Sequence, residues 1–157
     1  LLQDTIRVQD AAHLGTQKAV TVYRARQGKE PVAVAFRTVA PDGYNGRIEL
    51  LVAIWADGTL AGVRAVAHAE TPGLGDGIEM AKGDWITQFA GRSLGNPPAD
   101  DWKVAKDGGA FDQMTGATIT SRAVVKAVRR ALRFYRIRGA EKLFRTDNAQ
   151  PTGGTRP

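Results

Sequence analysis

Residues 114–135, MTGATITSRAVVKAVRRALRFY, join a cluster of hydroxyl groups to a strongly basic segment. Free backbone N–H groups at the start of a helix, together with the positive end of the helix dipole, favour an anion such as phosphate. Gly116 and Ala117 leave room for a ligand to approach that backbone. An ordinary N-cap by the hydroxyl of Thr118 or Thr120 explains the same residues, and spacing alone favours the cap.

The basic residues that follow allow two interpretations. A helix that reads a nucleic-acid groove presents cations together with side chains that bond base edges, but no Asn or Gln lies between Arg122 and Arg138. An amphipathic helix that packs on a core and keeps its arginines in solvent is the simpler interpretation. The same cations would also suit anionic lipid headgroups. Nucleic acid is therefore the weaker alternative.

A second segment, HAETPGLGDG, combines titratable side chains with glycines. His68 and Glu70 could act as acid and base, and the glycines could form a flat backbone platform for a planar ring. A structural histidine at a strand end, followed by an ordinary loop, is the alternative. Neither histidine accompanies a nucleophile motif such as GxSxG, so no Ser-His-Asp site is predicted. Asp112 is by itself a surface carboxylate or a helix-approach cap.

Composition limits the remaining possibilities. A chain of 157 residues with 43% apolar residues can bury one core, and its net charge of +6 favours acidic partners. The absence of cysteine excludes disulfides, thiol catalysis, iron–sulfur ligation and Cys-type zinc sites. Only two histidines occur and they form no HxxxH or HExxH pair, so no metal site is predicted. Redox chemistry would require a bound cofactor.

Alternating apolar residues predict a sheet. A strand is expected near residues 20–26, after an ill-defined N-terminal segment, and an antiparallel meander over residues 32–40, 46–56 and 59–68. The turn formers PDGYNG and ADG separate these runs. Both alternating sets of residues 46–56 are apolar, so helices are expected to cover both faces. The predicted fold class is α+β, with a central antiparallel sheet flanked by helices.

The remaining elements are predicted to be mostly helical. Residues 78–94 indicate one or two short helices that pack Trp85, Ile86 and Phe89 on the sheet, and residues 102–105 a short strand. A long helix is expected from Ile119 or Thr120 to about Arg138, ended by Gly139. Its predicted apolar stripe is Val124, Ala127, Val128, Ala131, Leu132 and Tyr135. Residues 1–145 are predicted to be a single domain and residues 146–157 a flexible tail.

Taken together, HAETPGLGDGIE and the later DQMTGATITS resemble the FMN-binding domain of two membrane electron-transport subunits. These are the G subunit of the Rnf complex, which it resembles more, and the C subunit of the sodium-pumping NADH:quinone oxidoreductase. The resemblance covers about residues 31–135. It implies that a flavin transferase moves FMN from FAD onto the last threonine of a D-x-x-[ST]-G-A-T motif as a phosphoester.

Mapped onto this sequence, the resemblance makes Thr118 the covalent attachment residue and Asp112 part of the flavinylation motif. A phosphodiester there would meet the positive end of the helix dipole, and Arg122 would add screening. Thr118 has no evident base beside it in the sequence, in keeping with an external enzyme. The remaining residues implied to contact the cofactor are Thr115, Gly116, Ala117, Ile119, Thr120, Glu70, Thr71 and Leu74.

The resemblance also implies a setting. The domain would pass electrons between redox centres of an ion-translocating complex in the cell inner membrane, on the periplasmic face, and would be no enzyme on its own. Its implied partners are the other subunits of the complex, the flavin transferase during maturation and the membrane, through an N-terminal helix that precedes this sequence; nucleic acid is not among them. The competing hypothesis is a noncovalent anion- or nucleic-acid-binding module in which Thr118 is only an N-cap.

Overall fold

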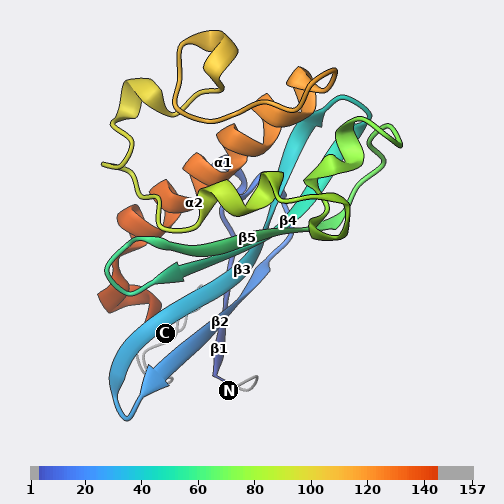
Figure 1. Cartoon of the computed structure of the whole chain (residues 1–157). Coiled ribbons are helices and arrows are strands. Elements are labelled where there is room, and N and C mark those ends of the chain that lie inside the picture. The colour runs from blue at the N-terminus through green and yellow to red at the C-terminus, as the bar shows by residue number, and fades with distance from the viewer. Residues whose placement is uncertain (1–3, 145–157) are drawn as a thin grey trace.

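The computed structural model describes residues 4–144, and the predicted tail at residues 146–157 lies outside this range. Five antiparallel strands form one sheet in the order β1-β2-β3-β4-β5, so each strand pairs with its neighbours in sequence (Figure 1). They are β1 Thr5–Val8, β2 Val20–Gln27, β3 Glu30–Gly43, β4 Gly46–Trp55 and β5 Leu60–Ala67. The predicted strands and hairpins are confirmed, and Gly58 adopts the expected positive φ of 93°. The short edge strand β1 was not predicted.

Helical segments complete the domain. The α-helices are α1 Ala11–Leu14 and α2 Thr118–Leu143, and Gly139 breaks the helical geometry of α2 with a φ of 77°. The 3-10 helices are η1 Gly75–Ile78, η2 Met80–Lys82, η3 Trp85–Phe89, η4 Ala99–Asp101 and η5 Ala105–Asp107. Residues 78–94 thus form single 3-10 turns instead of longer helices. Residues 102–105 form no strand, because Val104 makes only an isolated bridge to Phe111.

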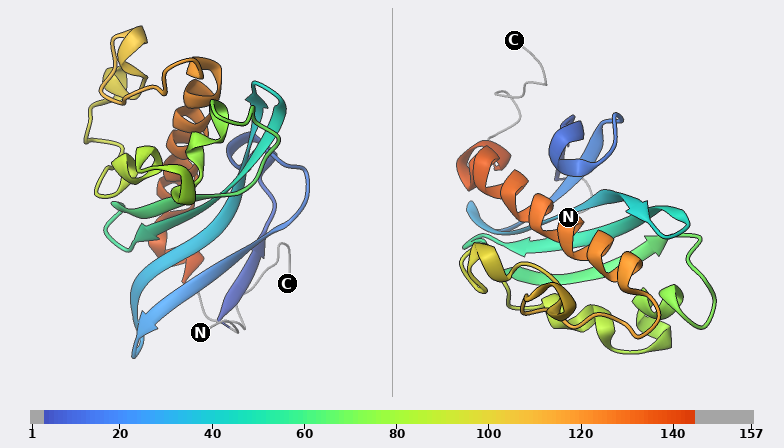
Figure 2. Two further views of the ribbon diagram at one scale, coloured as in Figure 1. Left: turned by 45° about the vertical axis from the view of Figure 1, so that its right-hand side comes forward. Right: turned by 90° about the horizontal axis from the view of Figure 1, so that it is seen from above.

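One face of the sheet carries the core. The inward residues of β4 are fully buried, and the whole predicted apolar stripe of α2 is buried as well, with Tyr135 the most exposed of the stripe at 6%. Phe36 of β3 meets Phe134 of α2 edge to face, with 5.1 Å between ring centroids. Figure 2 shows α2 and the segments that contain the 3-10 helices on this side of the sheet.

The predicted α+β class with a central antiparallel sheet is confirmed, but within residues 4–144 helices cover one face of the sheet, not both as expected. On the second face Tyr23, Leu51 and Trp55 are 41%, 37% and 47% exposed. The residues next to them on this face are small: Ala35 pairs with Tyr23 and with Ala53, and Ala53 pairs with Gly62. No described helix combines the length and the apolar composition that crossing a membrane requires.

Candidate cofactor-binding site

The two segments singled out in the sequence lie against each other, although 34 residues, 78–111, lie between them in the chain. A Cβ added at Gly75 would lie 2.8 Å from the Thr120 hydroxyl, and one at Gly77 would lie 2.9 Å from the Met114 sulfur. Only residues without a side chain allow the glycine-rich loop to approach the start of α2 this closely. The site is therefore built from the loop of residues 68–77 and the turn of residues 112–120.

Glu70 joins three parts of the chain. Its buried carboxylate, 3% exposed, accepts hydrogen bonds from the Tyr44 N–H and the Asn45 N–H, each at 3.0 Å. The Thr120 hydroxyl of α2 donates to the same carboxylate. Each of these donors satisfies a charge that would otherwise be costly to bury. Glu70 thus fixes the β3–β4 turn, its own loop and the first turn of α2 to one another.

His68 supports this loop from the strand end. Its Nδ1 accepts a hydrogen bond from the Glu70 N–H at 3.0 Å, so its proton is on Nε2, which donates to Glu79 at 2.7 Å. Both ring nitrogens are engaged by the protein. His68 therefore orients the backbone of Glu70, which agrees with a structural role at the strand end.

Asp76 closes the far side of the loop. Its carboxylate accepts from the Gly73 N–H at 3.0 Å and from the Lys82 ammonium at 2.7 Å. The hydrogen bond from Lys82 holds the pKa of Asp76 below its usual value, and the same bond raises the pKa of Lys82. Both groups stay charged across the neutral range, so the loop keeps this tie there.

The turn before α2 leaves a helix start without a side-chain cap. The Ala117 N–H donates to the Met114 carbonyl at 3.0 Å, with Gly116 at a φ of 76° inside the turn. Thr118 is the first residue of α2, and the Thr120 hydroxyl is turned away toward Glu70. The N–H groups of Thr118, Ile119 and Thr120 meet no acceptor within residues 4–144. Neither hydroxyl forms the N-cap that spacing favoured.

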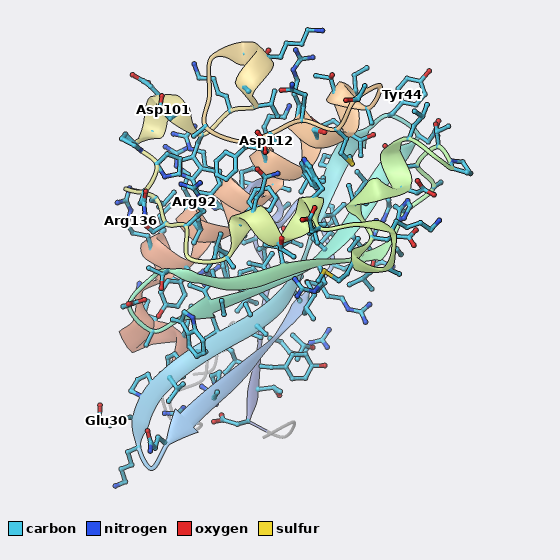
Figure 3. All side chains as sticks on the ribbon, viewed as in Figure 1. Glu30, Tyr44, Arg92, Asp101, Asp112 and Arg136 are labelled. Carbon is cyan, nitrogen blue, oxygen red and sulfur yellow. The ribbon has the colours of Figure 1, made fainter. Side chains whose placement is uncertain are left out.

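A third segment, η3, holds the turn in place. The Gln88 side chain accepts from the Asp112 N–H at 2.9 Å and donates to the Asp112 carbonyl at 3.3 Å. The Trp85 indole N–H donates to the same carbonyl at 2.7 Å. The backbone of Asp112 is therefore fixed while its side chain stays exposed, on the loop that approaches α2 in Figure 3.

Two hydrogen bonds anchor the other end of the turn, and two ionic groups border it. Ser121 Oγ accepts from the Met114 N–H at 3.0 Å and donates to the Ala117 carbonyl at 2.9 Å. Arg122 is bound through two nitrogens to Asp107, both at 2.7 Å, and this pairing lowers the pKa of Asp107. The charge of Arg122 is therefore largely satisfied within the protein.

Comparison with known proteins identifies this arrangement. The model of the FMN-binding domain family matches residues 43–133, which include both segments and η3. The chain belongs to the FMN-binding domain family. The predicted membership and the predicted cofactor, FMN, are thereby confirmed.

This FMN-binding domain is also similar to individual proteins of known name and to a solved structure. It is 49% identical to the G subunit of the ion-translocating oxidoreductase complex of Shewanella loihica over 150 residues, covering 96% of this chain and 71% of that protein. It is 53% identical to the corresponding G subunit from Vibrio cholerae, covering 77% of this chain and 58% of that protein. The crystal structure of NqrC from Shewanella oneidensis has the same fold, with a TM-score of 0.60 at 22% identity, covering 94% of this chain and 70% of NqrC.

The site of this FMN-binding domain fits its cofactor. The three free N–H groups at the start of α2 suit a phosphate, and the loop next to them presents little side-chain bulk. Leu74 and Ile119 are 46% and 48% exposed at this surface. A Cβ at Gly116 would lie 3.1 Å from Leu74, so the turn and the loop meet here as well.

The residues predicted to contact FMN differ in how accessible they are. Thr115 and Ile119 are exposed, Thr71 and Thr118 are half-buried, and Ala117 is buried. Glu70 and Thr120 are buried against each other, which leaves their contacts with FMN as predictions. The sequence did not indicate Tyr44, Asn45, Gln88 or Ser121, because their roles depend on contacts between distant segments. The polar Gln88 on an otherwise apolar face of η3 was the one available signal.

Proposed function

We propose that Thr118 carries FMN as a phosphoester and that the domain relays electrons in a membrane-bound, ion-translocating oxidoreductase complex of the Rnf type. The observation that carries the attachment site is the uncapped start of α2. The N–H groups of Thr118 and of the two residues after it meet no acceptor within residues 4–144. A phosphodiester keeps one negative charge there, which a helix dipole stabilises by roughly 0.3–1 kcal/mol.

The attachment is a transfer between two phosphate bonds. The Thr118 oxygen forms a bond to the FMN phosphorus, the pyrophosphate bond of FAD breaks, AMP leaves, and the hydroxyl proton is released. No free base stands beside Thr118 among the described residues: the nearby carboxylate Glu70 is already engaged by three donors. A flavin transferase would supply the base, and the exposed Asp112 side chain is available for its recognition.

Ring contacts would come from the glycine-rich loop. Five N–H groups of this loop donate within the protein, and those of Thr71 and Gly75 are among the ones that meet no acceptor in the described residues. These two N–H groups and the exposed Leu74 are our candidates for contact with the isoalloxazine ring. Bound FMN supplies the electron chemistry, and the protein supplies its position and surroundings.

The names of the relatives support the proposed setting. Both are named as subunits of an ion-translocating oxidoreductase complex, and this chain spans 71% and 58% of their lengths. We place the domain on the periplasmic face of the inner membrane, beside the other subunits of such a complex and anchored by a helix preceding residue 1. In this role the domain is an electron carrier of the complex, with no substrate turnover of its own.

The intact mass of the exported protein tests the attachment. After co-expression with a flavin transferase, the wild-type chain should gain one FMN less one water, and Thr118→Val should gain nothing. Thr115→Val removes an exposed hydroxyl from the same turn and should still gain the mass. An unmodified wild-type chain, or FMN that leaves on denaturation, would contradict the covalent proposal.

A further inference from the structure

The outward side of α2 is entirely basic over more than four turns. With a helical rotation of about 100° per residue, every position of α2 that faces away from the core between residues 122 and 136 is cationic. We call this surface the basic ridge; it consists of Arg122, Lys126, Arg129, Arg130, Arg133 and Arg136. Figure 2 shows α2 lying on one face of the sheet, at the outside of the molecule.

Most of this charge is not neutralised by the protein. Arg122 pairs with Asp107 and Lys126 pairs with Asp42, both near the start of the helix. Arg129, Arg133 and Arg136 form no ion pair within residues 4–144. Arg129 Nε is buried without a hydrogen-bond partner. Unpaired arginines so close together repel one another, so the arrangement favours an anionic partner.

The shape of the basic ridge selects among anionic partners. A protein interface concentrates its binding energy in aromatic or apolar anchors, and the basic ridge contains none. Ile119 and Ile137 are exposed on the same side, but they lie at opposite ends. A helix that reads bases needs amide side chains, and the basic ridge has no Asn or Gln. A convex row of arginines fits a planar array of phosphates, with the aliphatic stems among the headgroups.

We propose that the basic ridge docks the domain on anionic phospholipid headgroups. Thr118 lies on the same helix, about 27 Å from Arg136 at a rise of 1.5 Å per residue. Docking through the basic ridge therefore brings the proposed attachment turn to the membrane surface. The proposal concerns the chain itself and does not depend on the attachment of FMN.

Binding of the flavin-free chain to lipid vesicles tests whether the basic ridge docks on anionic phospholipids. Vesicles of phosphatidylcholine with phosphatidylglycerol should bind the chain, and vesicles of phosphatidylcholine alone should not. The double variant Arg133→Gln/Arg136→Gln should weaken binding on the order of tenfold or more, because each cation near an anionic surface contributes about fivefold. Both side chains are exposed, so the variant should fold normally.

The second face of the sheet provides a matched control. Arg37→Gln/Arg64→Gln removes the same charge from exposed positions on β3 and β5 and should keep the wild-type affinity. An equal loss in both double variants would mean that net charge alone drives binding, and the proposal would fail. It would also fail if the wild-type chain ignored phosphatidylglycerol, or if duplex DNA bound the ridge more tightly than the vesicles did.

Discussion

Glu70 illustrates how one buried carboxylate organises the site. Its two oxygens receive two backbone N–H groups from the β3–β4 turn and one hydroxyl from α2. Gly43 and Gly75 leave the room it needs, since a Cβ at Gly43 would lie 3.0 Å from its Oε2 and one at Gly75 would lie 2.9 Å from its Cβ. The residue thus holds the glycine-rich loop and the proposed attachment turn together.

Glu70→Ala should destabilise the domain by about 3 kcal/mol, because it leaves the buried Thr120 hydroxyl and two part-buried N–H groups without an acceptor. Glu70→Gln keeps the shape and one acceptor oxygen, so its cost should be smaller, about 1–2 kcal/mol. Urea denaturation measures both. Glu79→Gln, which changes the more exposed carboxylate beside His68, serves as the control and should cost less than either. Equal stability of Glu70→Ala and wild type would refute this role.

At the scale of elements, η3 positions the segment that leads to Thr118. A single 3-10 turn directs Trp85 and Gln88 at the backbone of Asp112, while Ile86 and Phe89 enter the core. Phe89 stacks on Phe111, the residue before Asp112, with ring centroids 5.1 Å apart. This segment is therefore fixed to the core immediately before the turn that leads to Thr118. In the proposed attachment reaction, such a fixed segment would present the Thr118 hydroxyl to the transferase in one orientation.

Gln88→Ala should slow flavinylation severalfold, since the two hydrogen bonds to Asp112 no longer hold the segment, and should cost about 1 kcal/mol in stability. The rate of mass gain with purified transferase and FAD measures the first effect. Thr87→Ala removes a hydroxyl that donates to Asp84 on the same turn and should flavinylate at the wild-type rate. A Gln88→Ala chain that flavinylates as fast as wild type would show that the hydrogen bonds from Gln88 to Asp112 have no such role.

The elements also show what a sequence can and cannot predict. The strict alternation at Ile48, Leu50, Val52 and Ile54 predicts a strand, and the stripe in α2 predicts its buried face, because both are local periodicities. Leu51 and Trp55 are as apolar as these inward residues, so the sequence pattern does not tell the two faces apart. Their face is exposed because the described helices pack on the other face of the sheet. The motif residues located the site, whereas the partners of Glu70 come from a turn whose contact with the loop no local pattern encodes.

At the scale of the molecule, a charged clamp joins the two ends of the described chain. Arg24, buried inside β2, bonds Asp4 before β1 and donates to the Leu143 carbonyl at 3.1 Å. Arg26 bonds Asp4 at 2.9 Å and the Phe144 carbonyl at 3.0 Å. The clamp therefore ties the C-terminal end of α2 to the sheet, at the opposite end of the helix from Thr118.

Asp4 should make this clamp sensitive to acid. Burial acts to raise the pKa of Asp4, but the hydrogen bonds and charges of Arg26 and Arg24 outweigh it and hold that pKa below the usual 3.8. Because the pKa of Asp4 is lower in the folded state than in the unfolded state, its ionised carboxylate stabilises the fold at pH values above the unfolded-state pKa. This stabilisation is lost as the pH falls through the folded-state pKa. Asp4→Asn should therefore cost roughly 1 kcal/mol at neutral pH and progressively less below about pH 4. Denaturation at several pH values measures the difference, and a constant difference would contradict the assignment.

Fragment-ion mapping of the flavinylated protein tests the central proposal most directly. Trypsin cuts after Lys106 and Arg122 and releases residues 107–122, which contain Thr115, Thr118, Thr120 and Ser121. We predict that the fragment ions place the added FMN mass between Ala117 and Ile119, on Thr118 alone. The same mass on Thr115, Thr120 or Ser121, or a tryptic peptide of unmodified mass from protein matured in its native compartment, would contradict the account.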